Sequence, residues 1–179
     1  LDDADHLSFR TDWLFETSDT SSIRVFAQYF DADNNGAAMK GFYDTTPDKR
    51  ELSQNTLSKY ELESTVIGAI GEADLGFASL KALASWQEDD IYVIRDNDRH
   101  NLFHDPSSVS SNAPFYVGVE FNPESQLQET TTFEVNLISN EAWLGTFDWI
   151  VGAFYLDQEI EGHIREFLDD NFNGVYDGT

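Results

Sequence analysis

The sequence predicts an all-β fold, namely a segment of an antiparallel transmembrane β-barrel with short periplasmic turns and long extracellular loops. Six stretches alternate apolar and polar residues, which is the period of a β-strand. The links between them are alternately short and long, as in outer-membrane barrels. The expected strands are Leu7–Glu16, Ser22–Asp31, Leu57–Ile70, Gly76–Gln87, Glu129–Ile138 and Phe147–Gln158.

The links between the strands favour a barrel over a compact soluble domain. The short links are Thr17–Ser21, Gly71–Leu75 and Ser139–Thr146, and the first two contain the Ser, Asp and Gly residues that favour chain reversal. The long links are Ala32–Thr56 and Glu88–Gln128. Unstructured connections beyond about 12–15 residues are uncommon in compact domains. Long links that all lie at one end are explained by loops that face the outside of a cell.

Each expected strand has an apolar side. The residues assigned to it are Leu7, Phe9, Trp13 and Phe15 in the first, Ile23, Val25, Ala27 and Tyr29 in the second, Tyr60, Leu62, Val66 and Ile70 in the third, Leu80, Ala82, Ala84 and Trp86 in the fourth, Phe133, Val135 and Leu137 in the fifth, and Trp149, Val151, Ala153 and Tyr155 in the sixth. Aromatic residues lie toward both ends of this side, with small and aliphatic residues between them. Trp and Tyr gather at membrane interfaces, so this distribution favours two aromatic girdles around a lipid-facing band. The same aromatic residues could instead fill the core of a β-sandwich.

The opposite side carries charges of both signs, which suit a water-filled lumen and equally the solvent face of a soluble sheet. The charged residues assigned to it are Arg10, Asp12, Arg24, Lys59, Glu61, Glu63, Lys81 and Glu134.

Composition excludes several classes of protein. The 179 residues carry a formal net charge of -24, which argues against a nucleic-acid partner. Cysteine is absent, so no disulfide framework or thiolate site is expected. No apolar run reaches the roughly 18 residues of a transmembrane helix. The polar start LDDADH suggests a mature chain or an internal piece.

Six strands are too few to close a barrel, because single-chain bacterial barrels have at least about 8. An open sheet in lipid would leave edge groups without hydrogen bonds. The sequence therefore predicts about six strands of a larger barrel.

The last two stretches carry the most distinctive pattern. Residues 128–139 read QETTTFEVNLIS, and residues 147–159 read FDWIVGAFYLDQE. Together they resemble a recurrent hairpin in the barrels of TonB-dependent outer-membrane receptors, where Glu-Leu-Arg-Leu-hydrophobic-Ser precedes hydrophobic-Asp-Trp-hydrophobic-hydrophobic-Gly-hydrophobic-Phe-Tyr. This sequence departs from the pattern at Glu134-Val135-Asn136, where Glu-Leu-Arg is usual. Looser similarity extends over residues 7–158.

The resemblance implies that residues 1–179 form part of a TonB-dependent receptor barrel of about 22 strands, with the plug domain not present. It implies a location in the outer membrane and TonB-energised uptake of a scarce ligand such as a siderophore, vitamin or oligosaccharide. The implied partners are outer-membrane lipid, a small-molecule ligand, and, through other parts of the receptor, the plug domain and the TonB complex. No catalytic signature is visible, so we do not expect an enzyme.

Two short motifs resemble the start of an EF-hand calcium loop, D-x-D-x-N-G. The first would need Glu at its twelfth position, where Phe42 stands, and the second reaches the last printed residue before that position. Calcium is thus the one cofactor that the sequence suggests, although turn formation explains the same residues. The candidate ligands are Asp31, Asp33, Asn35, Asp169, Asn171 and Asn173.

The long links are also rich in aromatic residues. Outer loops that capture ligands often place aromatic faces over polar groups, although long loops also need an apolar nucleus of their own. The candidate ligand-binding residues are Phe42, Tyr43, Tyr92, Phe103, Phe115 and Tyr116.

The alternative to a barrel is a secreted soluble β-sandwich that binds carbohydrate or calcium. The two differ at Val25, Leu80, Ala82, Val135 and Val151, which face lipid in the barrel and are buried in the sandwich.

Overall fold

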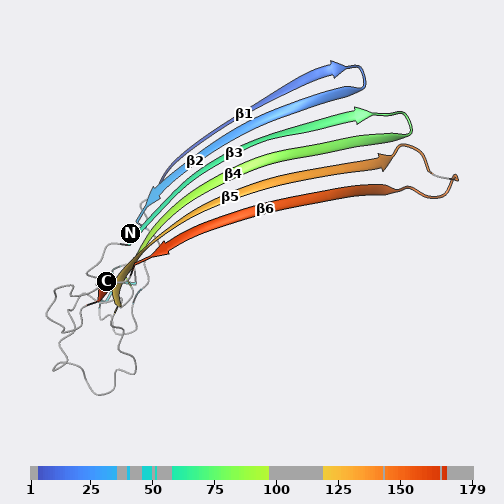
Figure 1. Cartoon of the computed structure of the whole chain (residues 1–179). Coiled ribbons are helices and arrows are strands. Elements are labelled where there is room, and N and C mark those ends of the chain that lie inside the picture. The colour runs from blue at the N-terminus through green and yellow to red at the C-terminus, as the bar shows by residue number, and fades with distance from the viewer. Residues whose placement is uncertain are drawn as a thin grey trace, which may run out of the picture.

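The computed structural model of this chain describes residues 4–35, 40, 46–49, 51, 58–96, 119–142, 144–165 and 167–168. Within these ranges the fold is all-β and consists of one antiparallel sheet (Figure 1). The strands are β1 (Ala4–Ser18), β2 (Ser21–Asn34), β3 (Lys59–Asp74), β4 (Ala78–Asp96), β5 (Val119–Ser139), β6 (Ile150–Ile164) and β7 (Phe167–Leu168). The ranges described include no helix with the length and hydropathy that a membrane span requires.

The sheet is a simple meander. Its order is β1-β2-β3-β4-β5-β6, so each strand pairs with its sequence neighbours, and the short β7 pairs with the start of β5. The links β1–β2, β3–β4 and β5–β6 lie together at one end of the curved sheet (Figure 1). All six predicted strands and their antiparallel order are confirmed, although some bounds differ. β3 continues past its predicted end at Ile70 to Asp74, and β6 is shifted from the predicted Phe147–Gln158 to Ile150–Ile164.

The predicted link over residues 88–128 was wrong at both of its ends. β4 continues to Asp96 and β5 begins at Val119, and their pairing extends from Ala78 opposite Ser139 to Asp96 opposite Phe121. The extension includes the run Ile91-Tyr-Val-Ile94, whose residue types favour strands. It was missed because the acidic run Glu88-Asp-Asp90 before it was interpreted as loop.

Directly opposed residues in antiparallel strands point to the same side of a sheet, so the register defines two faces. We call one the belt face. Two of its rows run Trp13–Val25–Ala69–Ala84–Phe133–Tyr155 and Phe15–Ile23–Gly71–Ala82–Val135–Ala153. We call the other the ion-pair face, and one of its rows runs Arg10–Gln28–Val66–Gln87–Thr130–Gln158.

The two sides of the third strand were assigned the wrong way round. Glu63 lies opposite Asp31 on the belt face, and Val66 lies opposite Gln28 on the ion-pair face. Lys59, Glu61 and Glu63 therefore share the belt face, whereas Tyr60, Leu62, Val66 and Ile70 share the ion-pair face. Residues 66–70 are apolar or Gly on both sides, so alternation could not orient the strand, and only pairing with β2 and β4 does so.

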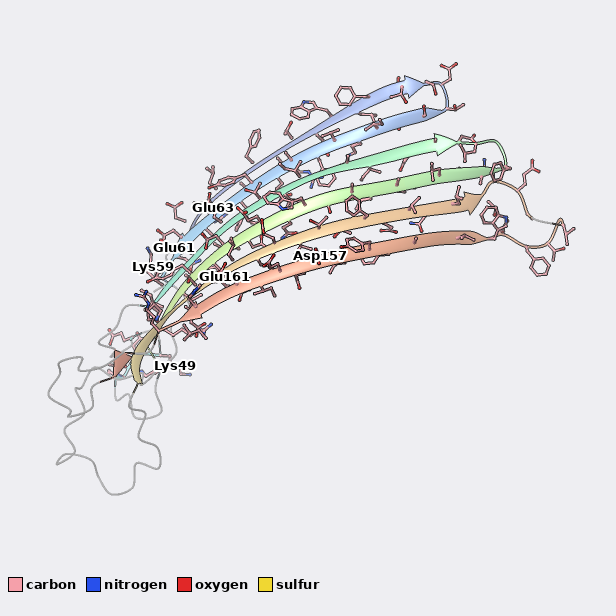
Figure 2. All side chains as sticks on the ribbon, in the orientation of Figure 1. Lys49, Lys59, Glu61, Glu63, Asp157 and Glu161 are labelled. Carbon is pink, nitrogen blue, oxygen red and sulfur yellow. The ribbon has the colours of Figure 1, made fainter. Side chains whose placement is uncertain are left out.

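The described residues form one layer without a core. Apart from Gly68, the buried positions among them are Ala32, Ala78 and Ser58, and no large side chain is fully buried. Side chains project from both sides of the sheet (Figure 2). None of the five residues that a sandwich would bury is buried here, and Val151 is 63% exposed. The sandwich architecture is thus not what these strands form.

Candidate functional site

The belt face carries a broad exposed apolar surface next to the short links. Its members alternate along every strand, and Trp13 remains 54% exposed and Tyr155 55% exposed. Monomeric soluble proteins rarely leave a contiguous apolar surface of this kind uncovered. The large apolar residues exposed in the rows of this surface are Trp13, Phe15, Ile23, Ile67, Phe133, Val135, Val151 and Tyr155. Leu7, Phe9 and Leu127 are also exposed on this face, but they lie farther from the short links, in rows that also carry acidic side chains.

Small residues make a shallow depression at the centre of the belt face. Ala69, Gly71, Ala82 and Ala84 are among the residues that line it, and its volume is about 550 Å³. Phe133 and Tyr155 also line it, with ring centroids 6.1 Å apart. The depression is open and mostly apolar, with Glu134 also among its lining residues, so it can accommodate a hydrocarbon chain.

Acidic rows follow the apolar rows toward the other end of the same face. One row contains Glu88, Glu129 and Glu159, and the next contains Asp31, Glu63, Asp90 and Glu161. Figure 2 labels Glu61, Glu63 and Glu161 toward the end of the sheet opposite the short links. Like charges that face each other across strands are destabilising, so this part of the sheet needs solvent and counter-ions around it.

Two contacts stabilise carboxylates in this acidic part of the face. The Tyr29 hydroxyl donates a hydrogen bond of 2.9 Å to Glu63 Oε1. Lys59 forms an ion pair with Glu61, and the hydrogen bond to this carboxylate raises the pKa of Lys59 above its ordinary value. Asp33 and Tyr92 add a smaller effect in the same direction.

The ion-pair face holds a compact cluster of charges on β1 and β2. Arg10 Nε donates to Asp12 Oδ2 at 2.8 Å. Arg24 donates to Asp12 Oδ1 from Nε at 2.9 Å and from Nη2 at 2.7 Å. The Arg10 guanidinium also lies 5.8 Å from the ring centroid of Phe26. Two cations thus share one carboxylate on a face that also exposes apolar side chains, among them Leu14 and, on β6, Phe154.

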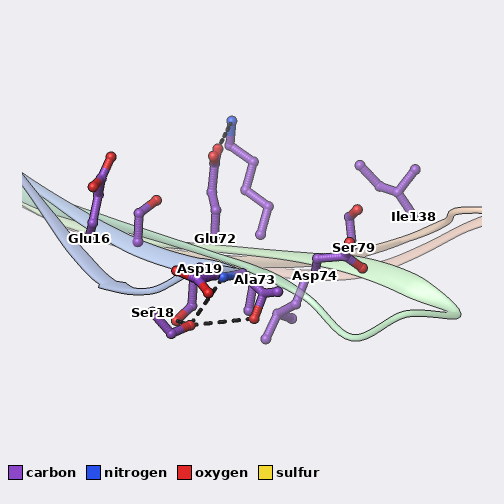
Figure 3. A pocket seen from close by; sticks show the side chains of 13 residues that line it. Glu16, Ser18, Asp19, Glu72, Ala73, Asp74, Ser79 and Ile138 are labelled. Atoms are coloured by element: carbon purple, nitrogen blue, oxygen red, sulfur yellow. Dashed lines mark hydrogen bonds and ion pairs between the residues drawn. The ribbon is translucent and has the colours of Figure 1, made fainter.

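An open cleft of about 970 Å³ lies at the short-link end of the sheet (Figure 3). Glu16, Asp19, Glu72 and Asp74 line it, and Lys81 Nζ pairs with Glu72 Oε1 at 3.0 Å. Hydroxyl groups contribute hydrogen bonds at its rim, where the Oγ atoms of Ser18 and Ser21 are 2.7 Å apart. The cleft is polar and open to solvent, and it lies between neighbouring turns.

The structure describes only some of the predicted site residues. Asp31 and Asp33 lie in β2 with both side chains on the belt face, and Asn35 directly follows that strand. Tyr92 lies in β4 opposite Glu61, so its assignment to a loop was wrong. The other predicted residues lie outside the described ranges: Phe42, Tyr43, Phe103, Phe115, Tyr116, Asp169, Asn171 and Asn173.

No group of three or more His, Asp or Glu side chains in the described ranges is arranged to hold a metal ion. Calcium binding by the two motifs stays a prediction, because the second motif lies outside those ranges.

Sequence reasoning missed two features of the site. The acidic rows were not recognised because most of their members were assigned to loops or to the other face. The signal was present in the run Glu88-Asp-Asp90 and in Asp157, Glu159 and Glu161, which alternate in step with Val151, Ala153 and Tyr155. The sharing of Asp12 by two arginines depends on register between strands, which alternation alone does not give.

No protein-family model, curated protein or solved structure matches this chain.

Proposed function

We propose that this chain forms part of the barrel wall of a TonB-dependent receptor in a Gram-negative outer membrane. Such a receptor takes up a scarce ligand, for example a siderophore, vitamin or oligosaccharide. The observation that carries the proposal is the belt face: one side of a single-layered sheet with a broad, exposed apolar surface beside the short links. Lipid is the partner that covers such a surface in a barrel.

The strand lengths support the same proposal. The six main strands have 14 to 21 residues, whereas about 9–11 residues suffice to cross a membrane. In β4 the apolar positions of the belt face run from Leu80 to Trp86, and Glu88 and Asp90 follow. We place this apolar part in the bilayer and the acidic rows beyond it in water.

The edges of the sheet are consistent with a larger barrel. β1 and β6 each have one paired neighbour in the described ranges, which leaves the outer backbone groups of both strands for further pairing. A bilayer does not tolerate unpaired edges, so in a membrane both strands would pair with other strands of the wall.

Energised uptake is tested in cells that produce the full-length protein and in a deletion strain. We would measure accumulation of radiolabelled ferric siderophore, cobalamin and maltodextrin, each with and without an uncoupler of the proton gradient. We expect one of the three probes to accumulate only in producing cells and only without the uncoupler. Equal accumulation in both strains for all three would contradict transport of these ligand classes.

A further inference from the structure

We propose that Arg10 and Arg24 form an anion-binding site on the ion-pair face, and that it takes a carboxylate or phosphate group carried by an apolar body. The inference rests on the proposed function, because it assigns a ligand chemistry to the lumen side of the wall. Its basis is local, since the two guanidinium groups and the one carboxylate of Asp12 leave a net charge of +1.

The two guanidinium groups retain unused donors. A guanidinium has five N–H groups. Arg24 uses two of them on Asp12, and Arg10 uses one on Asp12 and one, at 3.5 Å, on Gln28 Oε1. The remaining N–H groups can bind two oxygens of a carboxylate or phosphate in the forked geometry that arginine favours.

The surroundings hold the cations in place and add an apolar surface. Phe26 lies beside the Arg10 guanidinium, and Gly68 leaves the room that this ring occupies. Leu14 and Ile70 flank Arg24 as its direct partners on the two neighbouring strands. An anion with an aromatic or aliphatic body would therefore contact both kinds of surface at once.

Within the part of the chain that the structure describes, the other basic side chains on this face do not form an equivalent site. Lys81 pairs with Glu72 one to one, and Arg95 pairs with Glu124 at 2.8 Å. The Lys81 side chain is 52% exposed, close to the 46% of Arg24. Lys81 is therefore a suitable control, because it is a similarly exposed cation whose ion pair with Glu72 has no net charge.

The test uses the full-length protein in detergent micelles, with 4-fluorobenzoate as probe and 4-fluorobenzamide as its neutral analogue. Binding is measured from the fluorine line width, with empty micelles subtracted. We expect the protein to broaden the fluorine signal of 4-fluorobenzoate but not that of 4-fluorobenzamide. We expect inorganic phosphate to compete with 4-fluorobenzoate for the site. Arg24→Gln should weaken benzoate binding about tenfold, which matches the loss of one charged hydrogen-bonding group. Lys81→Gln should leave binding unchanged.

Equal binding of benzamide, or equal weakening by Lys81→Gln and Arg24→Gln, would overturn the proposal. If Arg24→Gln fails to fold by circular dichroism, Arg24→Lys replaces it; that variant keeps the charge, loses the fork and should bind less tightly than wild type. Competition by phosphate at far lower concentration than benzoate would identify phosphate as the preferred group. If the wild-type protein supports uptake but binds no anion in micelles, this site alone is refuted. If it binds the anion but supports no uptake, the transport function alone is refuted.

Discussion

The ring of Phe26 lies against Gly68, its direct partner across β2 and β3. A Cβ atom added at Gly68 would lie 2.8 Å from Phe26 Cε1 and 3.1 Å from the carbonyl oxygen of Ala84. The missing side chain of one residue thus makes room for the ring of the other. Because Phe26 also lies beside Arg10, this contact links the backbone of β3 to the charge cluster on β1.

Gly68→Ala should destabilise the fold, because the added methyl group forces the Phe26 ring or the strand to move. We expect a loss of about 1–3 kcal/mol, the usual range for overpacking. Gly71→Ala is the control in the same strand, since a Cβ there meets nothing within 4 Å. Denaturant unfolding in micelles measures both. Equal stability of the two variants would contradict the close contact seen at Gly68.

Asn140 connects two of the short links. Its Nδ2 donates to Asp74 Oδ1 at 2.7 Å and to the Gly76 carbonyl at 3.0 Å, and its Oδ1 accepts from Ser79 Oγ at 2.7 Å. Asn140→Ala removes all three bonds and should cost about 1–2 kcal/mol of unfolding free energy. Ser79→Ala removes only one bond and should cost less. If hydrogen exchange at the Gly76 and Phe77 amides is the same in Asn140→Ala as in wild type, Asn140 does not hold the links together.

The link between β5 and β6 contains a strained residue. Leu144 has a φ of 56°, a conformation that costs a residue with a Cβ roughly 1–2 kcal/mol. Leu144→Gly should therefore raise the melting temperature. Gly145, with a φ of 70°, provides the reverse test, because Gly145→Ala should lower it. A fall in melting temperature for both variants would mean that the Leu144 side chain contributes more than its backbone strain costs.

The Lys59–Glu61 pair gives a pH dependence at the acidic end of the sheet. The pKa of Lys59 is raised, mainly by the hydrogen bond to Glu61, so the stabilisation is complete below the unfolded value of about 10.5 and is lost as pH rises through the folded pKa. Glu61→Gln should lower the pKa of Lys59, as measured by NMR titration of its ε-methylene signals. Glu63→Gln, which removes another negative charge from the same face, should not alter the pKa of Lys59. A pKa of Lys59 that is the same in wild type and Glu61→Gln would refute the pairing.

The strands and their order were predictable because alternation and turn-forming residues are local signals. The orientation of β3 was not, since Val66, Ile67, Ala69 and Ile70 place apolar residues on both of its sides. The extension of β4 was missed because its acidic residues favour loops, although pairing with β5 stabilises them in a strand. The charge cluster could be predicted only in part: Arg10, Asp12 and Arg24 were assigned to one face, but their contacts depend on the β1–β2 register.

Site-directed labelling with a lipid-soluble, thiol-reactive probe in outer-membrane fractions tests the central claim most directly. The cysteine-free chain allows single cysteines at Ala82 and Val135, which face each other on the belt face, and at their neighbours Lys81 and Asn136 on the ion-pair face. We predict labelling at Ala82→Cys and Val135→Cys and little at Lys81→Cys and Asn136→Cys. Equal labelling on both faces, or a full-length protein found outside the membrane fraction, would contradict a lipid-facing belt.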